Sequence, residues 1–363
     1  MAASQSYDTV LPADSVEFCP HEGSRDIFVC GTYMLEQQQD VDVATNPNEP
    51  LSESERSQNR WGRCLVFKVT DTKAKLCTLV QEMTSPAVLD QKWCHRSRTS
   101  TAVLGIADSE GNISVQEWQP QNHRFRRLQN IPCLSGDVLC LSLDWSNRRY
   151  PSDHLGSLIV SLSDGSLCLL NPSSSDGLVV SNVWRAHDYE PWIAAWNYWE
   201  SSVVYSGGDD LSLKAWDIRQ PLHRPVFANR SFDAGVTSIQ NHPYIEHLLA
   251  VGSYDNAVRL FDTRNPLSPL TTIDVGGGAW RVKWHPSPER KNDLLVACMH
   301  DGFKIVNIDC KEYTMPYDIG KCFRQHESLA YGVDWSFHED VREKETLIAS
   351  CSFYDHKLCL WSG

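Results

Sequence analysis

The stretch Val203-Val-Tyr-Ser-Gly-Gly-Asp-Asp-Leu-Ser-Leu-Lys-Ala-Trp-Asp217 decides the fold of this 363-residue chain. It contains a run of β-branched and aromatic residues, a tight Gly-Asp-Asp turn and a second such run, which is the pattern of a β-hairpin. The pattern recurs along the chain, so the sequence has an internal repeat. The other copies cover residues 158–170, 249–262, 294–306 and 347–361.

Short apolar runs that end in an aromatic residue precede these hairpins, and seven such runs align along the chain. Their spacings are 75, 52, 51, 45, 43 and 51 residues. Seven units of this length predict an all-β fold, a seven-bladed β-propeller whose four-stranded blades leave only short, protected strand edges. The first and fifth runs fit the pattern more loosely than the others. The runs end at Phe18, Trp93, Trp145, Trp196, Asn241, Trp284 and Trp335.

Only the first interval is long, and residues 35–60 account for its excess. This segment, with its consecutive glutamines and its Asn-Pro-Asn-Glu-Pro motif, has almost no apolar content. Such a composition cannot bury enough apolar surface to fold, so we expect a disordered loop inside blade one. We therefore expect residues 1–363 to form one propeller domain with this loop as a plain insertion. A regulatory role for the loop is the alternative.

The balance of charge excludes some classes of partner. The chain has 33 basic and 46 acidic residues, which gives a formal net charge of −13. This sign is wrong for a protein that binds by neutralising phosphates, so we expect neither nucleic acid nor an anionic membrane as a partner. A basic partner is favoured instead. The chain begins with no basic and apolar leader and contains no run of about 18 apolar residues, so we expect a soluble, cytoplasmic protein, and the closed propeller predicts a monomer.

The cysteines and histidines give no sign of a metal or redox centre. There are 13 cysteines, none in a Cys-x-x-Cys arrangement, and most lie singly within apolar runs. We interpret them as reduced, buried small hydrophobic residues. Histidine and cysteine never group at zinc-finger spacing, and no P-loop or Rossmann fingerprint is present. We therefore expect no metal and no cofactor.

Ala186-His187 followed by Trp216-Asp217, together with Phe261-Asp262, resembles the WD-repeat family. The resemblance extends over nearly the whole chain. It implies that the N-terminal segment completes the last blade, that blade four contains a hydrogen-bonded tetrad, and that later blades carry turn aspartates. The tetrad would be His187, Ser206, Asp210 and Trp216, and the turn aspartates Asp255, Asp301 and Asp355.

Residues that the repeat does not require are candidates for a functional site. The position before the turn aspartate is polar or aromatic in blades four to seven, and the position four residues before the strand-ending aromatic is a large ring in blades four, six and seven. In WD propellers both positions lie at the same mouth of the central channel, so they predict an aromatic-walled, acidic pocket there. The first set is Asp209, Tyr254, His300 and Tyr354, and the second set is Trp192, Trp280 and Tyr331.

Aromatic rings beside a carboxylate form a site suited to a quaternary ammonium ion. Each ring face attracts a desolvated cation by about 0.5–2 kcal/mol. The residues alone leave two alternatives open. The aromatic side chains could instead pack the blades, or they could form a hot spot for a protein partner.

Candidate catalytic groups lie in the turns of the last two blades. A histidine near a cysteine or a serine can activate a nucleophile or a water molecule. His300 is therefore the candidate general base, and Cys298 and Ser352 are possible nucleophiles. Asp209 is the candidate carboxylate because the fold does not require it, whereas the turns explain the other aspartates. No Gly-x-Ser-x-Gly elbow is present.

Several strings outside the repeat consensus resemble one family, the diphthine methyl ester hydrolases, also called diphthine methyltransferase. The resemblance implies a step in making diphthamide, the modified histidine of translation elongation factor 2. That step is hydrolysis of the methyl ester of methylated diphthine, which releases methanol and leaves diphthine for later amidation. The strings are Ala13-Asp-Ser-Val-Glu17, Trp192-Ile-Ala-Ala-Trp-Asn-Tyr-Trp199, Tyr205-Ser-Gly-Gly-Asp-Asp210, Gly252-Ser-Tyr-Asp255, Trp280-Arg-Val-Lys-Trp-His-Pro286, Cys298-Met-His-Asp-Gly-Phe-Lys-Ile305 and Cys351-Ser-Phe-Tyr-Asp-His356.

On this resemblance, five aromatic side chains would enclose the trimethylammonium and imidazole groups of diphthine. His300 would act as general base, with Asp209 orienting it or contacting the cation, and the attacking group would be water, Cys298 or Ser352. The leading alternative is a non-catalytic WD-repeat adaptor in trafficking or ubiquitin-ligase complexes. A methyltransferase is disfavoured because no glycine-rich nucleotide-binding turn precedes a helix. The aromatic residues are Trp192, Trp280, Tyr254, Tyr331 and Tyr354.

Overall fold

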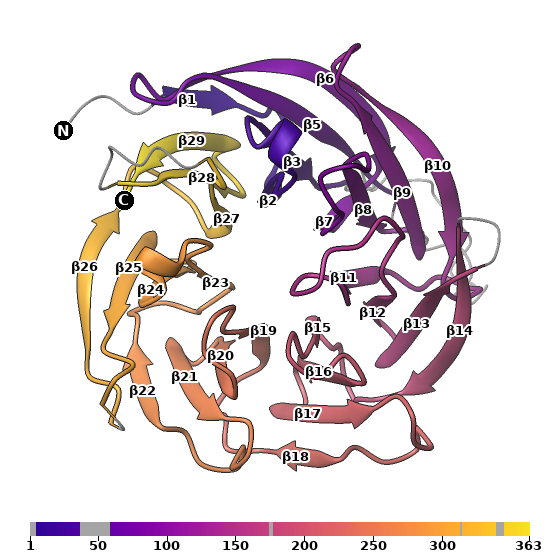
Figure 1. Ribbon diagram of the computed structural model, residues 1–363, viewed down its shortest axis with the longest axis vertical. Coiled ribbons are helices and arrows are strands. Elements are labelled where there is room, and N and C mark those ends of the chain that lie inside the picture. The colour runs from indigo at the N-terminus through magenta and orange to yellow at the C-terminus, as the bar shows by residue number, and fades with distance from the viewer. Residues whose placement is uncertain (1–4, 37–58, 174–176, 313, 339–344) are drawn as a thin grey trace, which may run out of the picture.

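Seven antiparallel sheets stand in a ring around a common centre (Figure 1). The computed structural model describes residues 5–36, 59–173, 177–312, 314–338 and 345–363. Successive sheets follow one another around the ring in chain order, and within each sheet the strands run from the centre outward (Figure 1). The predicted all-β, seven-bladed propeller is confirmed.

The first three blades begin with the innermost strands β2, β7 and β11. Blade one contains β2 (Ala13–Phe18), β3 (Ile27–Thr32), β5 (Arg60–Asp71) and β6 (Leu76–Pro86), with the short β4 (Met34–Leu35) paired to β5. Blade two contains β7 (Val88–Cys94), β8 (Val103–Asp108), β9 (Asn112–Gln119) and β10 (Arg124–Pro132). Blade three contains β11 (Cys140–Trp145), β12 (Leu158–Leu162), β13 (Ser166–Pro172) and β14 (Leu178–Arg185).

The other four blades repeat this order. Blade four contains β15 (Ile193–Trp196), β16 (Val203–Gly208), β17 (Ser212–Asp217) and β18 (Phe227–Asn229). Blade five contains β19 (Val236–Asn241), β20 (Leu248–Ser253), β21 (Ala257–Asp262) and β22 (Thr271–Asp274). Blade six contains β23 (Arg281–Trp284), β24 (Asp293–Ala297), β25 (Phe303–Ile308) and β26 (Tyr317–Phe323). Blade seven contains β27 (Ala330–Trp335), β28 (Leu347–Ser352), β29 (Lys357–Ser362) and β1 (Gln5–Asp8).

Strand β1, from the other end of the chain, closes the ring. It pairs antiparallel with β29, with Gln5 opposite Leu360 and Asp8 opposite Lys357. The N-terminal segment therefore completes the last blade, as predicted, and covers the outer edge of β29.

The long insertion of blade one begins and ends in ordered strand. Leu35 in β4 lies opposite Arg60 in β5, and the Asn59 side chain donates a 2.8 Å hydrogen bond to Glu36. The expected disordered loop over residues 35–60 was therefore too wide at both ends, because these flanking residues extend the sheet. Residues 37–58 lie outside the described ranges.

The aromatic residues that end the innermost strands join neighbouring blades. Nε1 of Trp93 donates a hydrogen bond of 3.1 Å to the backbone carbonyl of Glu17 in blade one, and Nε1 of Trp145 donates one of 2.8 Å to that of Lys92 in blade two. This contact explains why the repeat selects tryptophan at this position. It recurs from Trp196 to Asp144, from Trp284 to Gln240 and from Trp335 to Lys283.

The apolar core lies between neighbouring blades rather than at the centre of the ring. One buried cluster, for example, joins Val258 of blade five to Val282 and Cys298 of blade six. All cysteines are buried except Cys310 and Cys322, so the interpretation as small core residues holds for the others. Within the described ranges, no helix has the length and apolar character needed to cross a membrane.

Candidate functional site

Four aromatic side chains meet where the innermost strands of blades four to seven begin. Trp192 precedes β15, Trp280 precedes β23, Tyr331 lies in β27, and Tyr254 comes from the turn between β20 and β21. The Trp280 ring centroid lies 5.8 Å from that of Trp192, 5.7 Å from that of Tyr254 and 4.9 Å from that of Tyr331. The rings of Trp192 and Tyr254 meet edge to face at 6.5 Å. We call these four residues the aromatic cluster.

Trp280 is the most deeply placed member of the cluster. It is 8% exposed, whereas the other three rings are half-buried. The guanidinium of Arg281 lies 5.4 Å from the Trp280 ring centroid. A second cation near Trp280 would be repelled by this guanidinium, so a bound cation is better placed against Trp192 and Tyr254.

The indole N–H of Trp280 is buried and has no acceptor within the described ranges. A buried donor without a partner costs about 1–3 kcal/mol. Trp280 therefore carries a buried hydrogen-bond donor that no acceptor of the described residues satisfies.

Asp209 lies at the edge of the aromatic cluster. Its Oδ1 accepts a 2.7 Å hydrogen bond from Nε1 of Trp192. Burial, with the negative charges of Glu190 and Asp210, raises the pKa of Asp209 despite that hydrogen bond. A Cβ on Gly235 would lie 2.2 Å from the same oxygen, so only glycine allows the carboxylate to sit this close to the start of β19. Asp209 is thus held against the rings while its side chain stays open to solvent.

The predicted pairing of His300 with Asp209 is absent. No hydrogen bond or ion pair joins these residues in the ranges that the structure describes, and His300 is exposed. Their turns belong to blades six and four, with blade five between them (Figure 1). His300 makes no ring contact with the aromatic cluster within the described ranges.

Tyr354 makes no ring contact with the aromatic cluster within the described ranges. It is 70% exposed, and its ring contacts Phe353 at 5.0 Å rather than any member of the cluster. Phe353 in turn contacts Tyr331 at 5.3 Å. Tyr354 is nevertheless among the groups that raise the pKa of Tyr331, so its place in the wall of the pocket stays a prediction, with Phe353 as a further ring beside Tyr331.

Cys298 is unsuited to act as a nucleophile. Its side chain lies in the apolar core between blades five and six, and Sγ is 3.6 Å from the carbonyl of Val296. Burial raises the pKa of the thiol to about 12. Because the thiolate is the reactive form, this corrects the prediction that Cys298 attacks the substrate.

Blade four contains the predicted tetrad. Nε1 of Trp216 donates to Oγ of Ser206 (2.9 Å), Ser206 contacts Nε2 of His187 (2.7 Å), and Nδ1 of His187 lies 2.8 Å from Asp210. The tetrad inferred from the WD-repeat resemblance is confirmed.

Ser352 belongs to a similar network in blade seven. Its Oγ lies 2.5 Å from Nδ1 of His326 and donates to Asp355, while Nε2 of His326 lies 2.9 Å from Oγ of Ser350. Burial lowers the pKa of His326 to about 4. Ser352 is fully buried, so its hydroxyl stabilises the blade and does not face a substrate. This corrects the prediction of Ser352 as a nucleophile.

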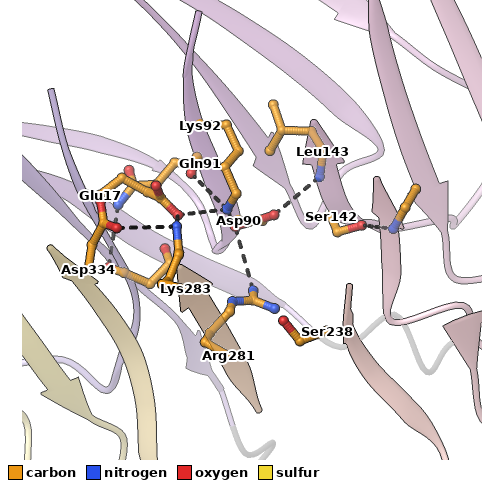
Figure 2. A network of polar contacts seen from close by, with 12 residues as sticks. Glu17, Asp90, Gln91, Lys92, Ser142, Leu143, Ser238, Arg281, Lys283 and Asp334 are labelled. Carbon is orange, nitrogen blue, oxygen red and sulfur yellow. Dashed lines mark hydrogen bonds and ion pairs between the residues drawn. The ribbon is translucent and has the colours of Figure 1, made fainter. Parts of the chain in front are cut away.

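Charged side chains of the innermost strands point toward one another at the centre of the ring (Figure 2). Glu17 lies 2.6 Å from Lys283 and 2.8 Å from Lys92, Lys92 lies 2.6 Å from Asp90, and Arg281 lies 3.5 Å from Asp90. The charges compensate one another and tie blades one, two and six together. No group of three or more histidine, cysteine or acidic side chains in the described part of the chain could hold a metal ion.

Two residues that influence the aromatic cluster were not predicted: Phe353, whose ring lies 5.3 Å from that of Tyr331, and Asp14, whose charge raises the pKa of Tyr331. The signal for Phe353 was its apolar character in the turn after β28, next to the predicted Tyr354. The signal for Asp14 was the repeat itself, because Asp14 stands four residues before Phe18, in the position that holds Trp192, Trp280 and Tyr331 in other blades.

Comparisons with known proteins extend the resemblance. No protein-family model matches the chain. Diphthine methyltransferase of Mus musculus is 41% identical over 92% of this chain and 69% of its own length. The human protein of the same name is 40% identical over 92% of this chain and 75% of its own length, and the Dictyostelium discoideum homolog is 35% identical over 96% of each.

Among solved structures, a chain of the mitotic checkpoint complex matches with a TM-score of 0.68. The alignment covers 100% of this chain and 95% of that one at 14% identity, so it supports the fold alone. The curated relatives, in contrast, share both high coverage and substantial identity with this sequence. The chain belongs to the diphthine methyltransferase family.

Proposed function

We propose that the protein is an enzyme of diphthamide biosynthesis that hydrolyses the methyl ester of methylated diphthine on translation elongation factor 2. Family membership supports an enzyme, and the name of the relatives connects it with diphthine and with a methyl group. The name of the relatives does not specify hydrolysis, so the release of methanol and diphthine is part of the proposal.

The recognition of a quaternary ammonium carries the proposal. Diphthine bears a trimethylammonium group, which cannot donate a hydrogen bond and is therefore recognised by ring faces and a nearby carboxylate. Trp192 and Tyr254 supply the rings, and Asp209, hydrogen-bonded to Trp192 at 2.7 Å, supplies the carboxylate. Each ring contributes about 0.5–2 kcal/mol to the free energy of cation binding, so these residues can hold the cation in the positions that the fold gives them.

The surrounding surface suits a basic segment of a protein substrate. Asp188 and Glu190 precede β15 of blade four, Asp233 precedes β19 of blade five, and all three are exposed. Negative charge around a site steers a positively charged partner and fixes its orientation. The net charge of −13 has the same sign.

Ester hydrolysis needs a base for the attacking water and a donor for the oxyanion that develops on the carbonyl oxygen. We assign the donor role to the unpartnered indole N–H of Trp280. This places the ester beside Trp280 and the cation beside Trp192, consistent with the repulsion that Arg281 would exert on a cation at Trp280.

The proposal is tested by incubating purified protein with elongation factor 2 that carries methylated diphthine. We expect methanol release with loss of the methyl ester from the modified residue, and a strong reduction in the Trp192→Ala variant. Methyl-group uptake from a methyl donor without methanol release would instead indicate a methyltransferase. Binding of the elongation factor without any chemical change would indicate an adaptor.

A further inference from the structure

Each blade has one residue that lies four positions before its strand-ending residue. These seven equivalent residues form a ring around the centre of the propeller. Three of these residues belong to the aromatic cluster. In three other blades the residue is leucine or threonine, and in blade one it is an aspartate. Asp14 is the one charged residue among the seven, so the fold does not explain its charge. The seven residues are Asp14, Leu89, Leu141, Trp192, Thr237, Trp280 and Tyr331.

The backbone around Asp14 is locally irregular. In the pairing of β2 with β3, Ala13 lies opposite Thr32 and Ser15 opposite Gly31, so Asp14 occupies a β-bulge without a partner residue. The same register shift occurs at Leu89, Leu141 and Thr237, the equivalent residues of blades two, three and five. The bulge is therefore a feature of the repeat, and Asp14 has the same placement in the ring as those residues while carrying a charge.

Asp14 is only 7% exposed, yet its carboxylate has no hydrogen bond or ion pair with any residue of the described ranges. The neighbouring acidic residues differ, because Glu17 and Asp90 both have lysine partners within 2.8 Å. Burying an unpaired carboxylate is costly, and such groups concentrate at functional sites.

The Asp14 charge acts on the aromatic cluster. After burial, it is the largest influence that raises the pKa of Tyr331, and it is also among those that raise the pKa of Tyr254. Burial raises the pKa of Asp14 itself to about 7; Arg281 and Lys92 oppose this shift, and Asp90 adds to it. A carboxylate in this range is half-ionised near neutral pH and is basic enough to accept a proton from water.

We propose that Asp14 is the general base of the ester hydrolysis, a catalytic residue contributed by blade one and facing the aromatic cluster of blades four to seven. This assignment rests on the proposed function. It replaces His300, which is exposed and forms no hydrogen bond or ion pair with Asp209 in the described ranges, in that role.

The step balances as follows. The Asp14 carboxylate takes one proton from a water molecule while the water oxygen forms a bond to the ester carbonyl carbon, and the carbonyl π pair moves to the oxygen near the Trp280 N–H. The pair then returns, the bond to the methoxy oxygen breaks, and the proton on Asp14 passes to that oxygen. Ester and water become acid and methanol, and Asp14 is again a carboxylate.

The test compares wild-type protein, Asp14→Asn, Asp14→Ala and a control, Asp137→Asn, whose exposed carboxylate lies in the loop between β10 and β11. Methanol release, KM, the pH profile and thermal unfolding are measured for each. We expect Asp14→Asn to lower kcat by about 100-fold or more, with KM changed less than about 3-fold and the fold intact.

Wild-type kcat should fall as pH is lowered through about 7, because the base must be deprotonated. Formate should restore part of the activity of Asp14→Ala, and the control should behave as wild type.

Different failures point to different errors. No methanol from wild-type protein would overturn the proposed function and the role of Asp14 with it. Methanol release by wild type with an unchanged kcat and pH profile in Asp14→Asn would overturn the role of Asp14 alone. A raised KM with unchanged kcat would make Asp14 a contact for the cation, which also contradicts the proposal. A loss of about 100-fold in His300→Ala with full activity in Asp14→Asn would return the base role to His300.

Discussion

The indole N–H of Trp192 donates a 2.7 Å hydrogen bond to Oδ1 of Asp209. Trp192 stands before β15 and Asp209 follows β16, so one hairpin of blade four fixes both the ring and the carboxylate. Oδ2 of Asp209 has no partner in the described part of the chain, and the residue is exposed. The hydrogen bond thus fixes the Trp192 ring beside a free carboxylate oxygen.

Asp209→Asn is expected to weaken substrate binding without changing the chemical step. The amide oxygen keeps the hydrogen bond from Trp192, so only the negative charge is lost. We expect KM to rise by about 10-fold, which corresponds to about 1.4 kcal/mol, with kcat little changed. Steady-state methanol release measures both constants. A fall in kcat at constant KM would instead give Asp209 a direct part in the chemistry.

Two substitutions of tryptophan by phenylalanine should differ in their effect on stability. Trp145→Phe removes the 2.8 Å hydrogen bond to the carbonyl of Lys92 and leaves that carbonyl without its donor. Trp280→Phe removes an N–H that has no acceptor. Both changes delete similar volume, so Trp145→Phe should be less stable than Trp280→Phe by about 1–2 kcal/mol. Urea unfolding of the two variants gives the difference, and equal losses would show that the hydrogen bond contributes nothing.

Trp280→Phe tests the proposed oxyanion donor separately from the aromatic cluster. The smaller ring still packs on Tyr331, so cation binding should change little. Loss of one such donor lowers kcat by about 10²- to 10³-fold in other enzymes, and we expect a fall in the lower part of that range. A kcat equal to that of wild type would remove Trp280 from the chemical step.

Ser352→Ala should reduce stability rather than activity. Its hydroxyl joins His326 to Asp355 inside blade seven, and its loss leaves buried polar groups unsatisfied. We expect a loss of about 1–3 kcal/mol in the free energy of unfolding, with kcat close to that of wild type in the folded fraction. Thermal unfolding and methanol release are the measurements. An acyl-enzyme trapped on Ser352 would contradict the structural role.

Asp14→Asn should stabilise the protein in a pH-dependent way. The pKa of Asp14 is raised to about 7 in the folded state, so folding is penalised once pH rises above its ordinary value and most strongly above pH 7. The neutral amide removes this penalty. We expect the variant to gain on the order of 1–3 kcal/mol relative to wild type at pH 8 and nothing at pH 4, in unfolding experiments across that range. Destabilisation at pH 8 would mean that the carboxylate is structurally required.

Much of the architecture follows from the sequence because the repeat is local. The strand-ending residues Trp93, Trp145 and Trp335 each make one contact with the preceding blade, and the contact recurs in all five units that carry tryptophan at this position. The tetrad of His187, Ser206, Asp210 and Trp216 was likewise predictable, because all four residues belong to one blade and its preceding loop. The meeting of Trp192, Trp280 and Tyr331 followed from their equivalent positions in the repeat.

The tertiary structure decided which equivalent positions touch and which way each side chain points. The repeat gives a residue its blade and its place within the blade but not the direction or reach of its side chain. The rings of Trp192 and Trp280 in blades four and six therefore meet at 5.8 Å, whereas His300 and Asp209 of the same two blades form no hydrogen bond or ion pair in the described ranges. The direction of a side chain depends on local packing, which buries Cys298 in the core and places the ring of Phe353 against Tyr331.

Asp14 shows the division most clearly. The sequence determines that a carboxylate occupies a position of the repeat where other blades carry rings. Only closure of the ring, by the pairing of β1 with β29, brings blade one beside blade seven and places that carboxylate within electrostatic reach of Tyr331, more than 300 residues away in the chain. Contacts of this kind depend on how many blades complete the circle, which is a property of the whole fold and not of any segment of it.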